Sequence, residues 1–493
     1  MSIKFFLDQH GCSKNQVDGE IIISILTQNG FEQTFDVGKA KLIIINSCGF
    51  IESAKKECLE AVYSARSNYP KAKILLAGCL AERYAQELSE SLLEADAIFG
   101  NGDLSKIVDA AKAALKSKHS FIQEKQEGIS CAERQMFLSF PASTYIKITE
   151  GCNNRCAFCA IPLIRGNLRS RKASEIVKEI KKLLSQGIFE FNLIGQDLAA
   201  YGAGQKDSVF GKGRTELPHY DADKNQIQPK TKSALCELLE EITKIKGNFW
   251  IRLLYIDPDN FNKDILKIIK SDKRILPYFD MPFQSGSSDV IKKMYRRGSR
   301  SSYEKVITDV RKVLPDAAIR TTLLSGFPGE TDEDALETQD FLKTIEPDWA
   351  GTFAYSKEDG TAAAKFKGVV PKKTAEKRAA DLVAIQSEIT KKRIALRVGK
   401  DYDVLIEEVV EGEDEGLAIG RAWFQAPDVD GSVVVRYEKE EAKAIFPGAL
   451  VRVHADRASD IDLDSVYIGE PSLKKATHRK SSLQFAPEIE NKK

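Results

Sequence analysis

Three cysteines, Cys152, Cys156 and Cys159, stand within eight residues of one another. This spacing lets three thiolates reach a single metal centre from one loop. Zinc usually takes four ligands, often in paired C-x-x-C units, and the next cysteine or histidine downstream is His219. Three thiolates instead match three irons of a 4Fe–4S cube, whose fourth iron stays open for another ligand. We therefore predict an iron–sulfur site here, with zinc as the alternative.

Cys12, Cys48 and Cys79 form a second group, although they are far apart in the sequence. Each follows an apolar run and adjoins a glycine. In an open parallel sheet the carboxyl ends of neighbouring strands share one crevice, so three cysteines at strand ends would converge there. Glycine would let the backbone come close to a bulky cluster. We predict a second three-cysteine iron–sulfur site; three small buried thiols are the alternative.

The other cysteines have simpler explanations. Nine cysteines in a chain without a secretory segment are expected to be reduced rather than paired in disulfides. Cys58 and Cys236 fit the faces of predicted helices, and Cys131 lies in a polar stretch. We predict no metal at these three residues.

Residues 1–120 are predicted to form an N-terminal parallel α/β sheet domain that carries Cys12, Cys48 and Cys79. Short apolar strands alternate with amphipathic helical stretches, as in β/α units. The expected strands are 3–7, 42–45 and 74–76, and the expected helices are 52–66 and 81–94. The polar stretch 116–134 is expected to be a linker.

Residues 138–372 repeat the alternation six times, which predicts a partial (β/α)6 barrel open on one side. The expected strands are 145–149, 191–194, 250–255, 278–283, 319–324 and 351–355. The expected helices between them are 173–185, 233–245, 263–269, 300–313 and 332–345. Residues 203–232 are rich in Gly, Lys, Asp and Pro and are expected to form a long loop.

A connecting helix is expected over residues 373–398. Beyond it the apolar residues alternate with a period of two, which predicts a small all-β barrel over 399–471. Its expected strands are 402–410, 417–424, 432–438 and 450–455. The basic tail, 472–493, is expected to be disordered. The fold class as a whole is α/β.

Length and hydropathy exclude several classes of protein. With 493 residues the chain exceeds the ~250–300 that one hydrophobic core supports, so several domains are expected. No apolar run approaches the ~18–20 residues of a membrane span, and the N-terminus lacks the apolar region of a secretory signal. We therefore expect a soluble, cytoplasmic protein that does not bind membranes.

The charge of the chain is unevenly distributed. The overall net charge is +1, but residues 400–470 contain 18 acidic and 7 basic side chains, a net charge of −11. The tail from residue 471 has 6 basic and 2 acidic side chains. An acidic surface repels phosphate backbones and attracts basic partners. A solvated domain surface is the simpler explanation of the same charge.

The cysteine spacing Cys152-x-x-x-Cys156-x-x-Cys159, with Phe158 before the third cysteine, resembles that of the radical S-adenosylmethionine superfamily. An N-terminal three-cysteine domain, such a barrel and a small β-domain, in this order, resemble the methylthiotransferases over about residues 1–470. In that family the β-domain is called TRAM and presents the substrate.

The family has two branches that matter here. The MiaB type modifies tRNA, and the RimO type methylthiolates an aspartate of small-subunit ribosomal protein twelve. The stretch 11–18, G-C-S-K-N-Q-V-D, resembles the RimO type, as do Gln196-Asp197 with Tyr201-Gly202 and the stretch 250–255. The stretch 281–287 departs from it, because a histidine would be expected after Gln284.

The resemblance implies two 4Fe–4S clusters and S-adenosylmethionine as cofactors, with Cys152, Cys156 and Cys159 holding the radical cluster. It also implies an aspartate β-carbon of ribosomal protein twelve as the site of modification, and an electron donor such as flavodoxin or ferredoxin. The acidic β-domain favours this basic protein substrate over tRNA. The alternatives are a tRNA (adenosine) methylthiotransferase and a non-catalytic, metal-stabilised ribosome or nucleic-acid binder.

Further polar residues stand where the carboxyl ends of predicted strands would be, and three arginines follow the cysteine loop. They could line a cofactor or substrate pocket, and turn, capping or ion-pair roles are equally open. The residues are Gln196, Asp197, Gln284, Arg320, Ser325, Arg165, Arg169 and Arg171.

Overall fold

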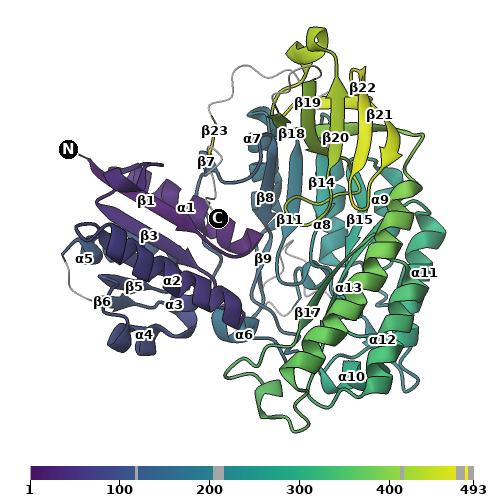
Figure 1. Ribbon diagram of the computed structural model, residues 1–493, viewed down its shortest axis with the longest axis horizontal. Helices are drawn as coiled ribbons and strands as arrows, with labels where there is room; N and C mark the ends of the chain where they lie inside the picture. The colour runs from purple at the N-terminus through teal and green to yellow at the C-terminus, as the bar shows by residue number, and fades with distance from the viewer. Residues whose placement is uncertain (1, 117–119, 204–215, 411–415, 474–482, 487–493) are drawn as a thin grey trace.

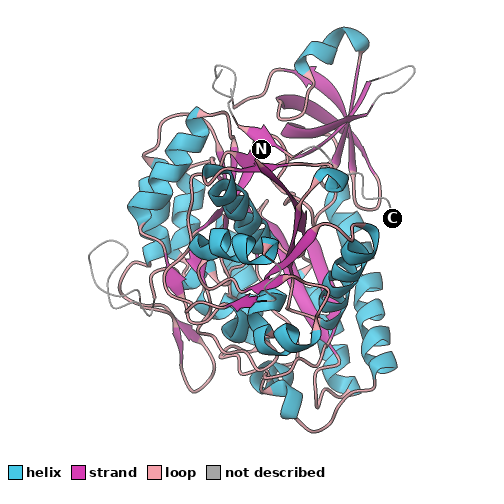
Figure 2. Ribbon diagram, turned by 90° about the vertical axis from the view of Figure 1, so that its left-hand side faces the viewer, coloured by secondary structure: helices cyan, strands magenta, loops and turns pink. Residues whose placement is uncertain are grey.

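A computed structural model describes residues 2–116, 120–203, 216–410, 416–473 and 483–486. An N-terminal domain lies beside a larger barrel domain, and a small all-β domain stands at one end of the molecule (Figures 1 and 2). A long helix, α13 (Lys372–Ala395), joins the last two along one side (Figure 1). Among the described residues no helix is both long and apolar enough to cross a membrane.

The N-terminal domain is a six-stranded parallel sheet in the order β2-β1-β3-β4-β5-β6. The central strand β3 is buried at every residue, as expected when helices cover both faces of a parallel sheet. Its strands are β1 (Ile3–Gln9), β2 (Phe31–Gln33), β3 (Leu42–Ser47), β4 (Lys73–Gly78), β5 (Ala97–Phe99) and β6 (Ser120–Ile122). Its helices are α1 (Ser13–Gln28), α2 (Glu52–Asn68), α3 (Cys79–Arg83), α4 (Ala85–Ser91) and α5 (Ile107–Leu115).

Two expectations for this domain need correction. The single helix expected over 81–94 is two short helices, α3 and α4, which meet at Tyr84. The sheet also extends beyond residue 120 into the expected linker, because β6 pairs with β5 through Ile98 and Phe121. Short edge strands of three residues carry too little periodic signal to be recognised in sequence.

The barrel domain is one open sheet of six parallel strands in the order β17-β16-β15-β14-β11-β8. The six expected strands are all present, and so is the open side. The strands are β8 (Ser143–Lys147), β11 (Glu190–Ile194), β14 (Trp250–Leu253), β15 (Ile275–Asp280), β16 (Ala318–Ser325) and β17 (Trp349–Ala354). The helices are α6 (Ile161–Ile164), α7 (Ala173–Ser185), α8 (Ala234–Thr243), α9 (Asp264–Ser271), α10 (Ser288–Lys293), α11 (Arg300–Val313) and α12 (Asp332–Ile345).

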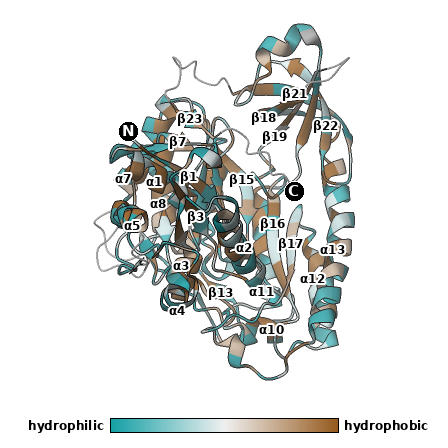
Figure 3. Ribbon diagram, turned by 60° about the vertical axis from the view of Figure 1, so that its left-hand side comes forward, coloured by the Kyte–Doolittle hydropathy of each residue, from teal (hydrophilic) through white to brown (hydrophobic). Residues whose placement is uncertain are grey.

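Hydrophobic residues concentrate on the barrel strands, such as β15, whereas outer helices such as α2 and α4 are mostly hydrophilic (Figure 3). The expected long loop, 203–232, lies partly outside the described residues. Its described part contains a small hairpin of β12 (His219–Tyr220) and β13 (Gln226–Ile227). A two-stranded ladder of β9 (Thr149–Glu150) and β10 (Arg169–Ser170) frames the cysteine loop.

The C-terminal β-domain is a closed five-stranded barrel in the order β18-β19-β20-β22-β21. Four of its strands follow the expected ranges, and the fifth, β22, was not anticipated. The strands are β18 (Asp401–Val410), β19 (Gly416–Arg421), β20 (Val433–Tyr437), β21 (Leu450–Ala458) and β22 (Leu463–Gly469). Closure leaves no free sheet edge, which stabilises so small a domain.

The expectation of a disordered tail over 472–493 is wrong for two of its residues. The strand β23 (Gln484–Phe485) pairs in parallel with β7 (Met136–Phe137), close to the start of the barrel domain. The rings of Phe485 and Phe137 lie 5.7 Å apart, so an apolar contact holds the strand. Residues 474–482 and 487–493 lie outside the described residues.

Candidate functional site: two cysteine trios at one domain boundary

Cys12, Cys48 and Cys79 lie at the carboxyl edge of the N-terminal sheet, the first two in loops and Cys79 as the first residue of α3. A Cβ atom on Gly11 would be 3.0 Å from Cβ of Cys48 and 3.4 Å from its Sγ. A Cβ atom on Gly49 would be 2.6 Å from the carbonyl oxygen of Cys79. The glycines beside the cysteines are therefore needed because these three segments touch one another.

Asn15, on the first turn of α1, ties these segments together. Its buried amide donates hydrogen bonds to the carbonyl oxygens of His10 (2.8 Å) and Asn46 (3.0 Å). In return, the side-chain amide of Asn46 donates to the carbonyl oxygen of Asn15 (2.8 Å). The side-chain oxygen of Asn15 lies 3.8 Å from Sγ of Cys79. One side chain thus fixes the ends of β1 and β3 relative to the start of α3.

Burial raises the pKa of the Cys48 thiol to about 11 and that of Cys79 to about 12. Neighbouring thiols add to both shifts, Cys12 among them, and Arg165 opposes them. Such thiols are weak nucleophiles at neutral pH, whereas coordination to a metal removes the proton outright. The donor chemistry of this trio therefore fits a metal centre better than a catalytic free thiol.

The second trio lies on the loop that follows β9. A Cβ atom on Gly151, whose φ is +74°, would be 2.2 Å from the carbonyl oxygen of Asn167. The N–H of Cys152 donates to the carbonyl oxygen of Gly166 (3.2 Å), which closes the loop at its base. At its tip the N–H of Ala157 donates to the carbonyl oxygen of Met294 (2.9 Å). The loop is thereby held from both ends against the barrel.

A buried polar network from three strand ends supports this loop. Asn154 donates to the carboxylates of Asp197 (3.1 Å) and Asp257 (3.2 Å). Asn260 donates to Asp197 (2.6 Å), and Arg296 pairs with Asp257 (2.7 Å). Burial raises the pKa of Asp257 to about 7, against the effect of Arg296. The network holds the loop at the carboxyl ends of the barrel strands, where active sites of such folds lie.

Of the network residues, the sequence indicated only Asp197. Asp257 and Asn260 follow β14 and belong to no motif that would mark them in the sequence. Arg296 follows α10, a helix that was not expected, so no signal placed it near the cysteines. It acts on the Cys156 thiol, whose pKa burial raises to about 12 and Arg296 lowers. Burial also raises the pKa of Cys159 to about 11.

The two trios meet across the boundary between the domains, where α6 lies (Figure 1). Cys79 packs in one apolar cluster with Ala160 and Ile164, which belong to the segment directly after Cys159. Arg165, at the end of α6, donates from Nη2 to Sγ of Cys79 (3.1 Å). A single short segment of the barrel domain therefore contacts both cysteine sites.

Four buried charges hold α1 of the N-terminal domain to the edge strand β8 of the barrel. Arg165 pairs with Asp18 (2.6 Å) and with Glu150 (3.2 Å). Lys147 pairs with Glu150 (2.7 Å) and also with Asp18. All four side chains are less than a tenth exposed. Of the roles that the sequence left open for Arg165, the structure shows ion pairing.

The opposite edge of the barrel is held by a second ion-pair group. Glu358, in the loop after β17, pairs with Arg83 (2.7 Å) and Lys55 (3.0 Å) of the N-terminal domain. Arg83 also donates to the carbonyl oxygen of Asp359 (2.8 Å). The N-terminal domain therefore bridges the open side of the barrel sheet from β8 to β17. This bridging covers the space that a closed barrel would fill with two further strands.

The β-domain closes the end of the barrel at which the strands begin (Figure 1). Arg421 of β19 pairs with Glu190 (2.7 Å), which also pairs with Arg252 (2.9 Å). Tyr278 donates to Asp430 (2.6 Å), a residue of the loop after β19. Glu190 is the first residue of β11, so these contacts lie at the amino ends of the strands, away from the cysteines.

Most of the other predicted polar residues have structural partners. Arg169 donates to the carbonyl oxygens of Gly128 and Asn167, and Arg171 pairs with Glu179. Arg320 pairs with Asp430, and Gln196 donates to Glu150. Gln284 has a φ of +71°, and Ser325 ends β16.

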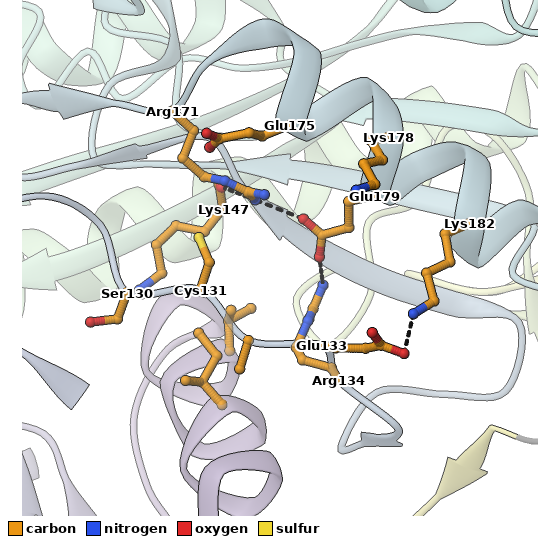
Figure 4. Close-up of a pocket in the computed structure, with 13 residues that line it drawn as sticks. Ser130, Cys131, Glu133, Arg134, Lys147, Arg171, Glu175, Lys178, Glu179 and Lys182 are labelled. Atoms are coloured by element: carbon orange, nitrogen blue, oxygen red, sulfur yellow. Dashed lines mark hydrogen bonds and ion pairs between the residues drawn. The ribbon is translucent and has the colours of Figure 1, made fainter. Parts of the chain in front are cut away.

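A cavity of about 230 Å³ lies along the seam between α1, α7 and the segment 130–134 (Figure 4). Five of its charged side chains form ion pairs with one another: Glu179 binds Arg171 and Arg134 (both 2.7 Å), and Lys182 binds Glu133 (Figure 4). Cys131 lines the cavity, which contains none of the six predicted ligands.

Among the described residues, no three side chains of His, Cys, Asp or Glu are grouped so that they could hold a single metal ion. The ligand sulfurs of a tetrahedral zinc site stand about 3.8 Å apart, given Zn–S bonds of about 2.3 Å. In a 4Fe–4S cube each cysteine binds a different iron, so its ligands stand farther apart. Neither trio is arranged as the ligand set of one ion.

Three family models match the chain in the order of its domains. The model UPF0004 matches residues 4–100, the radical SAM superfamily matches 146–342, and the TRAM domain matches 398–468. A solved structure with the same fold is the radical S-adenosylmethionine methyltransferase TsrM from Kitasatospora setae, with a TM-score of 0.50 and 12% identity. The match covers 74% of this chain and 77% of that one.

Curated relatives match nearly the whole chain. The ribosomal protein uS12 methylthiotransferase RimO of Treponema denticola is 48% identical over 94% of this chain and 100% of its own length. The protein of the same name from Carboxydothermus hydrogenoformans is 35% identical over 91% of this chain and 97% of its own. With its three domains in this order and this identity to its relatives, the chain belongs to the RimO family of radical S-adenosylmethionine methylthiotransferases.

Proposed function

We propose that this enzyme transfers a methylthio group to the β-carbon of an aspartate in ribosomal protein uS12. The observation that carries the proposal is the contact between the two cysteine sites: Cys79 packs on Ala160 and Ile164, and Arg165 binds its sulfur. A reaction that combines hydrogen abstraction with sulfur transfer needs two centres at one cavity. The names of the curated relatives support the same substrate protein.

Cys152, Cys156 and Cys159 would hold one 4Fe–4S cluster, and Cys12, Cys48 and Cys79 a second. With S-adenosylmethionine bound, these groups supply the radical and sulfur-transfer chemistry that an unactivated carbon requires. The protein residues position and isolate this chemistry. Burial disfavours the charged form of the Cys79 and Cys156 thiols and so raises their pKa values.

The three domains would divide the work in the following way. The Asn154–Asp197–Asp257 network orients the loop of the radical site. The pairs made by Asp18 and Glu358 hold the N-terminal domain over the barrel, so that the second site faces the first. The acidic β-domain would receive the basic substrate protein, and an electron donor such as flavodoxin or ferredoxin would dock elsewhere.

Metal analysis of the reconstituted protein tests the two-cluster assignment. We expect about eight irons and eight sulfides per chain for the intact protein, and about four of each for Cys156→Ala and for Cys79→Ala. Cys156→Ala should lose cleavage of S-adenosylmethionine, and Cys79→Ala should keep it. Cys236→Ala, at a buried helical cysteine far from both trios, is the matched control and should keep about eight irons. A colourless protein with about one zinc would refute the assignment.

Mass spectrometry of uS12 tests the substrate. In cells that lack this enzyme the methylthio mass on uS12 should disappear, and the wild-type gene should restore it whereas Cys156→Ala should not. The second candidate, tRNA methylthiolation, would be favoured instead if the purified protein bound tRNA tightly with a steep dependence on salt. The net charge of −11 over residues 400–470 argues against that outcome.

A further inference from the structure

Lys14 is a buried cation beside the N-terminal cysteine site, and within the described part of the chain it forms no ion pair. It lies in the first turn of α1, two residues after Cys12, and its side chain is 8% exposed. Its Nζ lies 2.9 Å from the centre of the Tyr255 ring. Lys14 takes part in none of the ion pairs formed among the described residues, whereas buried lysines are almost always paired.

Tyr255, which follows β14, holds the lysine from the barrel side. Its φ of +67° is unusual for a bulky residue, and such backbone strain gathers at functional sites. Its hydroxyl lies 3.4 Å from Oγ of Ser13, so the ring spans the gap between the barrel and α1. Cys12 next to this pair is exposed, and the site is therefore open to an incoming molecule.

An acidic group that acts on Lys14, Asp280, already has a hydrogen-bond partner. Asp280, at the end of β15, accepts a hydrogen bond from the N–H of Tyr255 (3.1 Å). Burial raises the pKa of Asp280, while Arg320 and, to a smaller extent, Lys14 act against that shift. Asp280 is therefore near Lys14 without forming an ion pair with it, and the ammonium group has no carboxylate partner among the described residues.

We propose that Lys14, positioned by the ring of Tyr255, binds the side-chain carboxylate of the target aspartate of uS12. This inference rests on the proposed function and names the residue that selects the target. The carbon to be modified is directly bonded to that carboxylate. A carboxylate held by Lys14 would therefore place this carbon on the first turn of α1, which begins directly after Cys12.

The chemistry of the pair accounts for selectivity. A carboxylate that pairs with a desolvated ammonium group forms a charge-assisted hydrogen bond, worth roughly twice a neutral one. An asparagine of the same shape would leave the buried charge of Lys14 without its partner, and such a mismatch is rejected strongly. The ring of Tyr255 stabilises the cation before the substrate arrives, and does not compete with the carboxylate for its protons.

The test is a cycle of binding measurements between reconstituted enzyme and purified uS12. The enzyme is wild type, Lys14→Met or Lys14→Arg, and uS12 carries its natural aspartate or asparagine in its place. Lys14→Met keeps the length of the side chain and removes the charge. Lys71→Met, at an exposed lysine of the same domain, is the matched control. Iron content and S-adenosylmethionine affinity are measured for every variant.

We expect wild type to bind natural uS12 about tenfold to hundredfold more tightly than the asparagine form. Lys14→Met should lose this preference, Lys14→Arg should retain most of it, and Lys71→Met should retain all of it. Iron content and S-adenosylmethionine affinity should be unchanged. With substrate turnover, Lys14→Met should raise KM for uS12 more than it lowers kcat.

Two results would overturn the inference without touching the proposed function. The first is a wild-type enzyme that modifies uS12 yet binds the aspartate and asparagine forms equally. This comparison uses only the wild-type enzyme, so it does not depend on whether an enzyme variant folds. The second is a Lys14→Met enzyme with unchanged preference. A Lys14→Met enzyme that loses affinity for S-adenosylmethionine and keeps the preference would assign the lysine to the cofactor instead. If wild type neither binds nor modifies uS12, the proposed function itself fails.

Discussion

Arg165 of the barrel domain donates a hydrogen bond of 3.1 Å to the sulfur of Cys79, which belongs to the N-terminal domain. The same guanidinium pairs with Asp18 and Glu150. Arg165 therefore contacts a predicted cluster ligand and also takes part in the ion pairs that join the two domains. Docking of the domains and the environment of Cys79 are thus physically linked through one side chain.

Substituting Arg165 should weaken the docking of the N-terminal domain. Arg165→Met leaves Asp18 and Glu150 to share Lys147, and the loss of one partner of a buried ion pair costs about 3–5 kcal/mol. Arg165→Lys should lose nearly as much, because one ammonium group cannot reproduce the forked geometry of a guanidinium. Hydrogen exchange of α1, measured by mass spectrometry, should show faster exchange in both variants.

Arg169→Met is the control for this prediction, because Arg169 donates to main-chain oxygens and forms no ion pair among the described residues. It should leave the exchange of α1 unchanged. Unchanged exchange in Arg165→Met would show that the four-charge group does not hold the domains together.

The two ion-pair groups on opposite edges of the barrel should act together. Asp18→Asn removes an anion at β8, and Glu358→Gln removes one at β17. Either variant alone should leave the N-terminal domain docked by the remaining group. The double variant should release it, which small-angle scattering would detect as a larger radius of gyration. Glu32→Gln combined with Glu358→Gln serves as control, because the pair of Glu32 with Lys4 is exposed and worth little.

A double variant that stays compact would contradict this prediction. It would show that apolar contacts are sufficient to hold the two domains together. The cluster of Cys79 with Ala160 and Ile164 would then be the contact to examine.

Gly78→Ala should damage the N-terminal cysteine site specifically. Gly78 has a φ of +93°, and a Cβ atom there would be 2.7 Å from both Oδ1 of Asn46 and the carbonyl oxygen of Ser47. The loop before Cys79 would have to move, and iron should fall from about eight to about four per chain. Gly30→Ala is a matched control, because its φ is +85° and nothing lies within 4 Å of the added atom.

Gly30→Ala should lose only the ~1–2 kcal/mol that a left-handed backbone costs a residue with a Cβ atom. Its iron content should be that of wild type. Equal iron loss in both variants would mean that backbone strain, rather than crowding at the cysteines, is responsible.

Glu190 should make the junction of barrel and β-domain sensitive to acid. Burial opposes its ionisation, but Arg421 and Arg252 outweigh burial and lower its pKa from 4.5 to about 2. A carboxyl group with a lowered pKa stabilises the fold above its unfolded-state pKa and loses that contribution as pH falls through the folded-state value. The stabilisation is therefore complete above about pH 5 and disappears between pH 4.5 and 2.

Glu190→Gln should lower Tm clearly at pH 7, since it leaves two buried arginines short of an anion, and the difference from wild type should shrink below pH 4.5. Glu407→Gln is the comparison. Glu407 pairs with the same Arg421, yet burial raises its pKa. At pH 7, Glu407→Gln should therefore lower Tm less than Glu190→Gln does. A pH-independent difference for Glu190→Gln would contradict the assignment.

Periodicity and spacing in the sequence were sufficient for much of the fold. The six barrel strands, the open parallel sheet of the N-terminal domain and the β-domain could all be predicted, because buried strands carry continuous or alternating apolar runs. Three-residue strands such as β6 could not be found in this way. Neither could β23, which exists through a contact with β7 almost 350 residues earlier in the chain.

The candidate site, like the fold, could be predicted only in part from the sequence. By itself, the sequence determined which residue types are available for the chemistry: two sets of three cysteines, adjacent glycines and an acidic β-domain. These follow from local spacing, which the chain carries into any fold. Only the tertiary structure decided that Arg165 reaches Cys79, that Glu358 holds the far edge and that Lys14 lies against the ring of Tyr255. Such pairings join segments distant in the chain, and the packing of domains, not periodicity, sets the distance between them.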